Sequence, residues 1–307
     1  MPRPKFPAVV DSSLISHFRA CPHKAFRESF EHWKPKQRSI HLHAGGAFAR
    51  GIEVARLAFY AEGRPVDQAV ARGLQALVEA YGNFECPADS AKSLERMMGA
   101  FEFYFDQYPL DKDTATPATL PGGRRGIEFF FVEPIDVTHP VTGEPLLYCG
   151  RFDAIMDYAG GVYGCDEKTT SGLGATWGAQ WDLRSQFTAY TWGARRQGIK
   201  LEGFLIRGIS ILKTKYDTQQ AITYRPEWMV DRWYHQMCID VERMKKAWES
   251  DSWDFNLDES CTSYGGCPFR RVCQTEPGRE IVFLRRDFAK RRWDPVTRVE
   301  TEVEEVE

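Results

Sequence analysis

Asp153, Asp166 and Lys168 are candidate catalytic or metal-binding residues, and they lie in one short stretch of the chain, Gly150–Thr170. Apolar runs flank Ala159-Gly160-Gly161 within it, which is the pattern of a β-hairpin. If the turn is centred on Ala159-Gly160, Asp153 faces Asp166. Facing side chains in a hairpin are about 4.5–5.5 Å apart at Cβ, and like charges there destabilise the sheet. Lys168 projects from the same face as Asp166, because side chains alternate along a strand.

Two carboxylates and an ammonium group on one patch of sheet predict a bound divalent cation. Mg²⁺ and Mn²⁺ prefer carboxylate oxygen and usually share their sites with substrate phosphates. The prediction depends on the turn, since a turn of odd length would separate the two aspartates. The three charges would then be solvated groups on an exposed hairpin.

A third motif follows the hairpin. Gln186 and Tyr190 occupy positions i and i+4 of an expected helix, eighteen residues or more after Lys168. Residues at this spacing share one helix face, so both side chains can point back toward the end of the hairpin. The order of the motifs resembles the PD-(D/E)XK nuclease superfamily, most closely its RecB-like branch. The three motifs are Gly150-x-x-Asp153, Asp166-x-Lys168 and Gln186-x-x-x-Tyr190.

This resemblance implies a metal-dependent DNA nuclease. Asp153 and Asp166 would bind one or two Mg²⁺ or Mn²⁺ ions, together with the backbone carbonyl of Glu167. Lys168 would orient the attacking water and stabilise the charge that develops on the phosphate. The glutamine and tyrosine of the third motif would hold the DNA strand or brace the lysine.

The segment Gly46–Glu53 resembles the first motif of the family, a helix in which a histidine usually stands where this chain has Arg50. Arginine cannot ligate a metal ion. Glu53, the nearby His43 or a water molecule could supply the third ligand instead. The same departure favours an alternative function: a catalytically silent DNA-binding or assembly subunit that retains the nuclease fold.

The cysteines form a second, independent pattern. The chain has eight, and no signal peptide precedes them, so we expect reduced thiols in a cytosolic protein. Several RecB-like nucleases, among them the AddB subunits and the CRISPR-adaptation and phage nucleases, hold a [4Fe–4S] cluster. They use one N-terminal and three C-terminal cysteines. The residues that match this layout are Cys21, Cys261, Cys267 and Cys273.

The same four thiolates could hold structural zinc instead of iron and sulfur. Zinc sites usually use cysteines separated by two to four residues, and this chain lacks such pairs, so the [4Fe–4S] cluster is the favoured prediction. The gap between Cys261 and Cys267 is five residues rather than the family's usual two. The remaining cysteines are expected to be small buried hydrophobic residues: Cys86, Cys149, Cys165 and Cys238.

Composition predicts a globular chain of one large domain, with 307 residues, 43 % hydrophobic and 27 % charged. No apolar run approaches the roughly 20 residues needed to span a bilayer. A net charge of −3 excludes a uniformly basic nucleic-acid binder. Basic clusters between Arg270 and Arg292, interspersed with Phe283, Phe288 and Trp293, could line a phosphate track or form a solvated surface.

The motif order predicts an α/β fold with a PD-(D/E)XK restriction-endonuclease-like core, a mixed central sheet flanked by helices. A helical insertion at about 64–115 and a C-terminal four-cysteine cluster would complete a nuclease domain over 1–275. A basic segment and an acidic tail would follow at 276–307, disordered past about 294. Helices are expected at 13–30, 45–62, 66–81, 90–108, 180–196 and 226–250, and strands at 126–136, 146–157, 162–170, 203–213 and 219–224.

The expected substrate is DNA that is single-stranded or has free ends, and the family's preference for ends favours an exonuclease. Recombination, phage replication and CRISPR adaptation are implied by analogy, with a helicase, a recombinase or a CRISPR protein as partner. The chain has no G-x-x-x-x-G-K-[ST] motif and therefore no P-loop helicase of its own. We expect it in the cytoplasm, which would be the host cytoplasm if a phage encodes it, and not at a membrane.

Overall fold

The computed structural model describes residues 3–263 and 266–303, which form two compact units. Each unit is assembled from separate stretches of the chain. Unit 1 comprises Met1–Gln37, Val132–Gly150 and Asp231–Glu307, and unit 2 comprises Arg38–Phe131 and Arg151–Val230. Both contain helices and strands, so the predicted mixed α/β class is confirmed. No helix in the described ranges is both long and apolar enough to cross a bilayer.

A five-stranded mixed sheet is the centre of unit 2. Its strand order is β3-β6-β7-β8-β9, with β7 and β8 parallel and the other neighbours antiparallel. All nine residues of β8 are buried, as expected for a central strand covered on both faces. The strands are β3 (Thr116–Pro117), β6 (Ala154–Tyr158), β7 (Gly161–Thr170), β8 (Gly203–Ile211) and β9 (Tyr216–Thr223).

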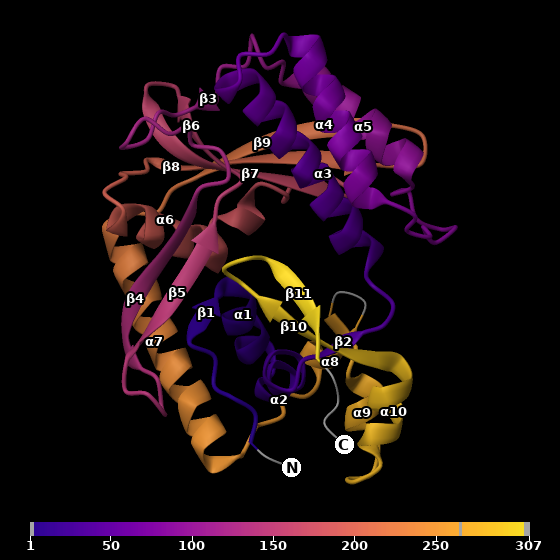
Figure 1. Ribbon diagram of the computed structural model, residues 1–307, viewed down its shortest axis with the longest axis vertical. Coiled ribbons are helices and arrows are strands. Elements are labelled where there is room, and N and C mark those ends of the chain that lie inside the picture. The colour runs from indigo at the N-terminus through magenta and orange to yellow at the C-terminus, as the bar shows by residue number, and fades with distance from the viewer. Residues whose placement is uncertain (1–2, 264–265, 304–307) are drawn as a thin grey trace. The chain divides into compact units, whose positions relative to one another are not determined.

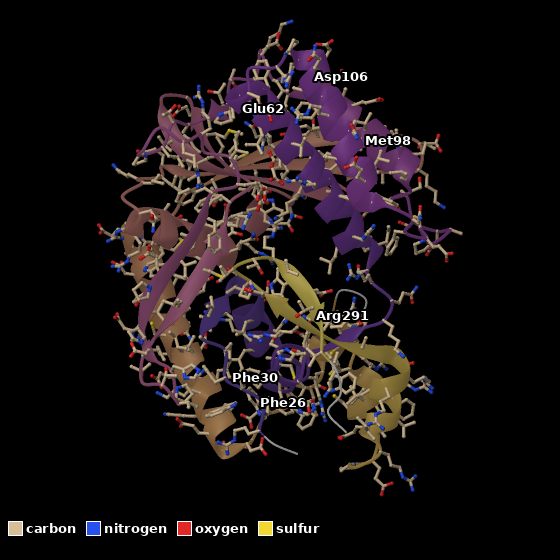
Figure 2. All side chains as sticks on the ribbon, viewed as in Figure 1. Phe26, Phe30, Glu62, Met98, Asp106 and Arg291 are labelled. Atoms are coloured by element: carbon tan, nitrogen blue, oxygen red, sulfur yellow. The ribbon has the colours of Figure 1, made fainter. Side chains whose placement is uncertain are left out.

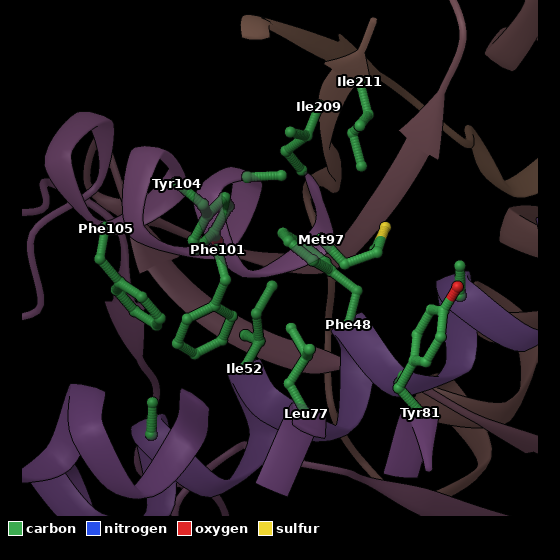
Figure 3. Packing of buried hydrophobic residues seen from close by; sticks show 14 of the residues in the cluster. Phe48, Ile52, Leu77, Tyr81, Met97, Phe101, Tyr104, Phe105, Ile209 and Ile211 are labelled. Atoms are coloured by element: carbon green, nitrogen blue, oxygen red, sulfur yellow. The ribbon is translucent and has the colours of Figure 1, made fainter. Parts of the chain in front are cut away.

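A layer of helices covers one face of this sheet (Figure 1). In this layer α3 (Ile40–Arg56) and α5 (Leu94–Gln107) contact the strands, and α4 (Val66–Tyr81) packs on α3 and α5. Their apolar side chains meet those of β8 in one buried cluster, which Figure 3 shows around Phe48, Phe101 and Ile209. Two glycines allow α3 and α4 to approach closely. A Cβ on Gly73 would lie 2.7 Å from the carbonyl oxygen of Gly51, and a Cβ on Gly51 would lie 2.9 Å from that of Gly73.

The opposite face of the sheet is covered by α6 (Ser185–Arg196). Phe187 of α6 stacks on Phe204 of β8, with ring centroids 4.9 Å apart. Gly164 of β7 leaves room for that ring, because a Cβ there would lie 2.3 Å from Phe204. Consequently the even-numbered residues of β7 face α6, and the odd-numbered ones face α3 and α5.

The β6–β7 hairpin has the predicted register. Ala159 and Gly160 form the turn and both have positive φ, 48° and 81°, as a two-residue type I′ turn requires. The ladder runs from Tyr158↔Gly161 to Ala154↔Cys165. Continued by one position, this pairing places Asp153 opposite Asp166, immediately beyond the last paired residues.

Unit 1 contains two three-stranded sheets. One has the order β1-β5-β4, formed by β1 (Val9–Asp11), β5 (Pro145–Arg151) and β4 (Phe130–Thr138). The other has the order β11-β10-β2, formed by β11 (Val299–Glu302), β10 (Phe288–Asp294) and β2 (Trp33–Pro35). The segment past residue 294, expected to be disordered, therefore contains β11, and its last four residues lie outside the described range.

The helices of unit 1 include α1 (Ser12–Ala20), α2 (Pro22–Ala25), the single-turn π-helix η1 (Phe26–Phe30), α7 (Glu227–Ser250), α8 (Glu259–Thr262), α9 (Arg270–Cys273) and α10 (Glu280–Asp287). Asp11 caps α1 by accepting a hydrogen bond from Leu14 N–H. The single helix expected over 13–30 is interrupted at Cys21, whose backbone is extended. Phe26 and Phe30 of η1 lie next to each other (Figure 2), and both rings pack on Trp253.

Candidate active site

Asp153, Asp166 and Lys168 lie together in unit 2, as the hairpin register predicts. Lys168 Nζ is 2.5 Å from Asp166 Oδ2, and the Asp166 side chain is 3 % exposed. Asp153 Oδ2 accepts a hydrogen bond of 3.1 Å from the backbone N–H of Glu167. This contact connects the residue at the end of the hairpin with the centre of the Asp166-x-Lys168 motif.

The carboxylates of this group are held under electrostatic strain. Burial raises the pKa of Asp153, and the negative charges of Asp166 and Glu167 raise it further. Burial also raises the pKa of Asp166, although Lys168 and Arg184 oppose that rise. Burial disfavours the Lys168 ammonium, but the two aspartates outweigh it and raise the Lys168 pKa. The two aspartates would therefore be stabilised by additional positive charge.

The donor set fits a hard divalent cation. Asp166 Oδ2 is buried, and the Lys168 ammonium lies 2.5 Å from it. Two buried carboxylates that face each other and share one lysine form the kind of oxygen donor set that Mg²⁺ or Mn²⁺ prefers. Across the described ranges, no group of three or more His, Cys, Asp or Glu side chains is arranged to hold a metal ion. The site presents two aspartates, so other ligands would come from the backbone, water or substrate.

The first-motif residues lie on α3. Glu53 forms an ion pair with Arg50, one turn earlier on the same helix, at 2.7 Å. His43 Nε2 is 2.8 Å from the carbonyl oxygen of Tyr81, and its ring stacks on Phe84. His43 is thus bonded to another part of the helical layer, and Glu53 as a metal ligand stays a prediction.

Gln186 and Tyr190 point together from α6, as the i,i+4 spacing predicts. The side-chain amide of Gln186 donates to the Tyr190 hydroxyl at 3.1 Å. The Tyr190 ring packs on Phe152 at 4.7 Å between centroids. Phe152 directly precedes Asp153, so the helix braces the strand segment that carries the first aspartate.

Arg184 was missed by the sequence reasoning. It directly precedes α6, is exposed, and contributes positive charge at both Asp166 and Lys168. The backbone of this loop is held by buried Arg225, which donates to the carbonyl oxygens of Trp181 at 2.6 Å and Arg184 at 3.4 Å. The sequence feature that could have identified Arg184 is its position, two residues before Gln186 of the third motif.

The side chain of Glu167 was also missed, since only its backbone was considered. Strand alternation turns it to the opposite face from Asp166 and Lys168, where it is 2 % exposed and paired with Arg56 of α3. Burial disfavours its charge, but Arg56 outweighs burial and lowers the Glu167 pKa. The sequence feature that could have identified this side chain is its place between Asp166 and Lys168, because a charged residue there must lie on the opposite, helix-covered face of the strand.

The four predicted cluster cysteines belong to unit 1. Cys21 lies between α1 and α2, Cys261 in α8, Cys267 shortly after it, and Cys273 at the end of α9. Cys267 N–H donates to the Cys261 carbonyl oxygen at 3.0 Å. Burial raises the pKa of Cys273 to about 11, and the thiols of Cys267, Cys21 and Cys261 add to this. The thiols are therefore electrostatic neighbours, although they do not form a ready metal site in the described part of the chain.

The other four cysteines do not join this group. Cys149 and Cys165 are buried, and the Cys165 thiol lies 3.4 Å from Glu167 Oε1 in unit 2. Cys86 and Cys238 are partly exposed, so burial is confirmed for only two of the four. All eight cysteines are free thiols.

One expectation about the C-terminal aromatic residues is corrected. Phe288 is 4 % exposed and stacks on Phe269 at 4.7 Å, so it belongs to the core of unit 1 and offers no surface for bases. Phe283 is covered by the guanidinium groups of Arg271 and Arg286. Trp293 remains 39 % exposed.

No family model and no curated protein matches the sequence. Among solved structures, the chain is similar to a crystal structure from Eubacterium rectale that is provisionally assigned as an exonuclease. The identity is 13 %, the match covers 88 % of this chain and 94 % of the other, and the TM-score is 0.47. A second similar structure, SSO0001, has 15 % identity, coverage of 63 % and 73 %, and a TM-score of 0.29. At these TM-scores the likeness establishes neither a family nor an activity.

Proposed function

We propose that unit 2 is a metal-dependent nuclease that hydrolyses DNA phosphodiester bonds. The observation that carries the proposal is the convergence of Asp153, Asp166 and Lys168 at the end of one hairpin. Two carboxylates whose charged forms are disfavoured, next to a lysine held cationic, form the electrostatic setting for a divalent ion and a phosphate together. The motif order around them adds the resemblance to RecB-like nucleases.

The side chains have separate roles in this proposal. Asp153, Asp166 and the backbone carbonyl of Glu167 would hold Mg²⁺ or Mn²⁺, which supplies Lewis-acid polarisation of the phosphate when bound. Lys168 stays protonated because of the two aspartates, so it can donate to the attacking water or to a phosphate oxygen. Arg184 adds a second cation beside the site, where it would attract the DNA backbone.

The substrate class follows from the same resemblance, with DNA ends as the preferred target and an exonuclease as the leading form. A helicase, a recombinase or a CRISPR protein would then deliver the end, in recombination, phage replication or CRISPR adaptation. The alternative function, a silent DNA-binding or assembly subunit, is favoured by one observation. Arg50 takes the place of the family's histidine, and it pairs with Glu53.

The experiment that separates these functions uses labelled DNA with Mg²⁺, Mn²⁺ or EDTA. Linear single-stranded, linear duplex and covalently closed circular DNA are compared, with the label at the 5′ or the 3′ end. An exonuclease degrades the linear forms, spares the circle and shows its polarity through the label. DNA binding without cleavage under any of these conditions would establish the silent subunit.

Asp157→Asn is the matched control for the site. Asp157 lies on the same hairpin as Asp153 and is exposed. Asp153→Asn, Asp166→Asn and Lys168→Met should each abolish cleavage, whereas Asp157→Asn should cleave like the parent protein. Full activity in any of the three site variants would disprove the assignment.

We further propose that Cys21, Cys261, Cys267 and Cys273 hold a [4Fe–4S] cluster in unit 1. Burial raises the pKa values of Cys267 and Cys273, and the neighbouring thiols of Cys21 and Cys261 add to both rises. This proximity supports the proposal, since four neighbouring thiols are the donor set of such a cluster. Eight free thiols also fit a reducing compartment such as the cytoplasm.

The colour and metal content of the protein test this cluster. Anaerobically purified protein should be brown, with broad absorbance near about 400 nm. A colourless protein with one zinc ion per chain would show that the four cysteines hold zinc instead of the cluster. A protein with neither iron nor zinc would refute the four-cysteine site.

A further inference from the structure

Glu167 connects the proposed catalytic face of β7 with the helical layer behind it. Its backbone N–H donates to Asp153 Oδ2 at 3.1 Å on one side. Its side chain extends to the other side of the sheet, where it is 2 % exposed. Glu167 therefore links the peptide that holds Asp153 to the groups that anchor its side chain.

Two residues from different helices form that anchor. Arg56, near the end of α3, pairs with Glu167 Oε1 and also donates to the Tyr104 hydroxyl at 3.0 Å. Tyr104 of α5 donates its own hydroxyl hydrogen to the same Glu167 oxygen at 3.0 Å. The three polar groups close a triangle of contacts, and each is buried from solvent.

A second buried ion pair completes the charge balance of this layer. Arg207 of β8 donates to both carboxylate oxygens of Asp113, at 2.6 and 2.8 Å, and lies 3.5 Å from the Tyr104 hydroxyl. The Arg207 guanidinium also stacks on the Tyr108 ring at 4.0 Å. Two buried cations thus face two buried carboxylates. Because an unpaired buried charge is costly, Glu167 cannot easily leave Arg56.

We propose that Arg56 and Tyr104 are positioning residues that act through Glu167. They fix its side chain behind the sheet, and the Glu167 N–H in turn orients the Asp153 carboxylate at the front. The catalytic meaning of this linkage rests on the proposed nuclease function. The linkage itself is a property of the metal-free fold and can be measured without DNA.

Tyr104→Phe is the sharpest test, because it removes only the hydroxyl and keeps the ring in the core. Tyr81→Phe is its matched control. Tyr81 belongs to the same buried cluster, is 3 % exposed, and donates its hydroxyl to the carbonyl oxygen of Lys92 at 2.8 Å, away from Glu167. Each variant loses the hydrogen bond that its hydroxyl donates, and Tyr104→Phe also loses the one that Arg56 donates to the hydroxyl. Exchange at Glu167 is therefore compared with exchange at other buried amides of β7 in the same variant, which separates a local change from a general loss of stability.

Two quantities are measured for each variant. The first is the hydrogen-exchange rate of the Glu167 amide in metal-free protein, followed by NMR. The second is the Mn²⁺ concentration that gives half-maximal thermal stabilisation. A hydrogen bond to a buried carboxylate is worth about a tenfold change or more in a local equilibrium, so we expect roughly tenfold faster exchange and weaker Mn²⁺ binding in Tyr104→Phe. Tyr81→Phe should match the parent protein in both.

Arg56→Lys adds a graded step, because it keeps the charge but replaces the planar guanidinium, whose Nη2 donates to both Glu167 and Tyr104, by an ammonium on a flexible chain. Its exchange rate should lie between those of the parent and Tyr104→Phe. Exchange at Glu167 that is equal in Tyr104→Phe and Tyr81→Phe would overturn the inference. If exchange responds as expected but the parent protein neither binds Mn²⁺ nor cleaves DNA, the linkage stands and the proposed nuclease function fails.

Discussion

At the scale of single residues, the chemistry depends on charges that the fold makes unfavourable. Asp153 and Asp166 face each other beyond the last pair of a hairpin, and burial raises the pKa of both. Lys168 compensates one of them, at 2.5 Å from Asp166. A divalent cation would neutralise the excess negative charge of the two aspartates, so metal binding and stability are coupled at this site.

Asp153→Asn should therefore stabilise the metal-free protein. The amide oxygen can still accept from the Glu167 N–H, while the repulsion with Asp166 disappears. Because the folded-state pKa of Asp153 is raised, its destabilising effect grows as pH rises from the ordinary carboxyl pKa toward the raised folded-state pKa, and is fully present above it. At pH 8 in EDTA we expect a gain of about 0.5–1 kcal/mol in the free energy of unfolding, measured by urea denaturation. Asp157→Asn is measured in the same way as a control. The prediction would be contradicted if Asp153→Asn lowered the free energy of unfolding by as much as Asp157→Asn does, or by more.

Three histidines of unit 1 should make stability depend on pH. Burial lowers the pKa values of His17, His23 and His32 to about 4. The unfolded chain binds protons near pH 6.5, where the folded protein does not, so the free energy of unfolding should fall as pH drops from about 6.5 to 5. His17 contributes at most about 1.4 kcal/mol per pH unit, and the more exposed His23 and His32 contribute less because solvent screens them.

His17→Gln tests this dependence, since Gln does not titrate. The difference in urea midpoint between pH 7 and pH 5 should be smaller in the variant than in the parent protein. An unchanged difference would show that His17 is accessible to protons in the folded state.

At the scale of elements, the sheet of unit 2 is positioned by helices on both faces. The helical layer depends on the close approach of α3 and α4 at Gly51 and Gly73. On the other face, α6 is set by Phe187 against Phe204. The segments that carry the site residues, β7 and the residues before β6, are therefore held by helices on both faces of the sheet. A catalytic site needs such rigid support to keep its side chains in position.

Gly73→Ala should destabilise the protein. Its new methyl group would lie 2.7 Å from both Ala55 Cβ and the Gly51 carbonyl oxygen, and these positions cannot move without separating the helices. We expect a loss of about 1–3 kcal/mol.

Gly46→Ala is the matched substitution on α3, where nothing lies within 4 Å of the added atom. It should instead stabilise by up to about 1 kcal/mol, because alanine is the better helix former. Urea denaturation of both variants measures the difference, and equal effects would show that helix propensity, not packing, governs these positions.

At the scale of the whole molecule, each unit is built from segments that are distant in sequence. In unit 1, the N-terminal segment and the C-terminal segment share a sheet through β2 and β10. The four proposed cluster cysteines also come from these two segments, and Cys261 lies 240 positions after Cys21. A cluster across them would restrict the unfolded chain in the way a long-range cross-link does.

Cys21→Ser should therefore weaken unit 1 as well as remove the cluster absorbance. By analogy with a cross-link closing a loop of more than 100 residues, the loss is about 4 kcal/mol or more. Limited proteolysis of anaerobic protein should cut the N-terminal and C-terminal segments faster in this variant. Cys238→Ser, in the same unit but away from the group, should keep both the absorbance and the cleavage pattern.

The sequence alone determined the features that depend on near neighbours. The Ala159-Gly160 turn sets the β6–β7 register, so the Asp153–Asp166 pair followed from local chemistry. The bounds of α4, 66–81, also matched, because its apolar positions recur with helical spacing. The i,i+4 pair on α6 was predictable for the same reason.

The tertiary structure decided which side chains meet across the sheet. Glu167 pairs with Arg56, 111 residues earlier, and with Tyr104, 63 residues earlier. Strand alternation predicts the face on which Glu167 lies, but which helix covers that face depends on the packing of the whole unit. The burial of Phe288 against Phe269 was settled in the same way. Periodicity assigns a residue to a face, whereas its partner is chosen by the packing of segments far apart in the chain.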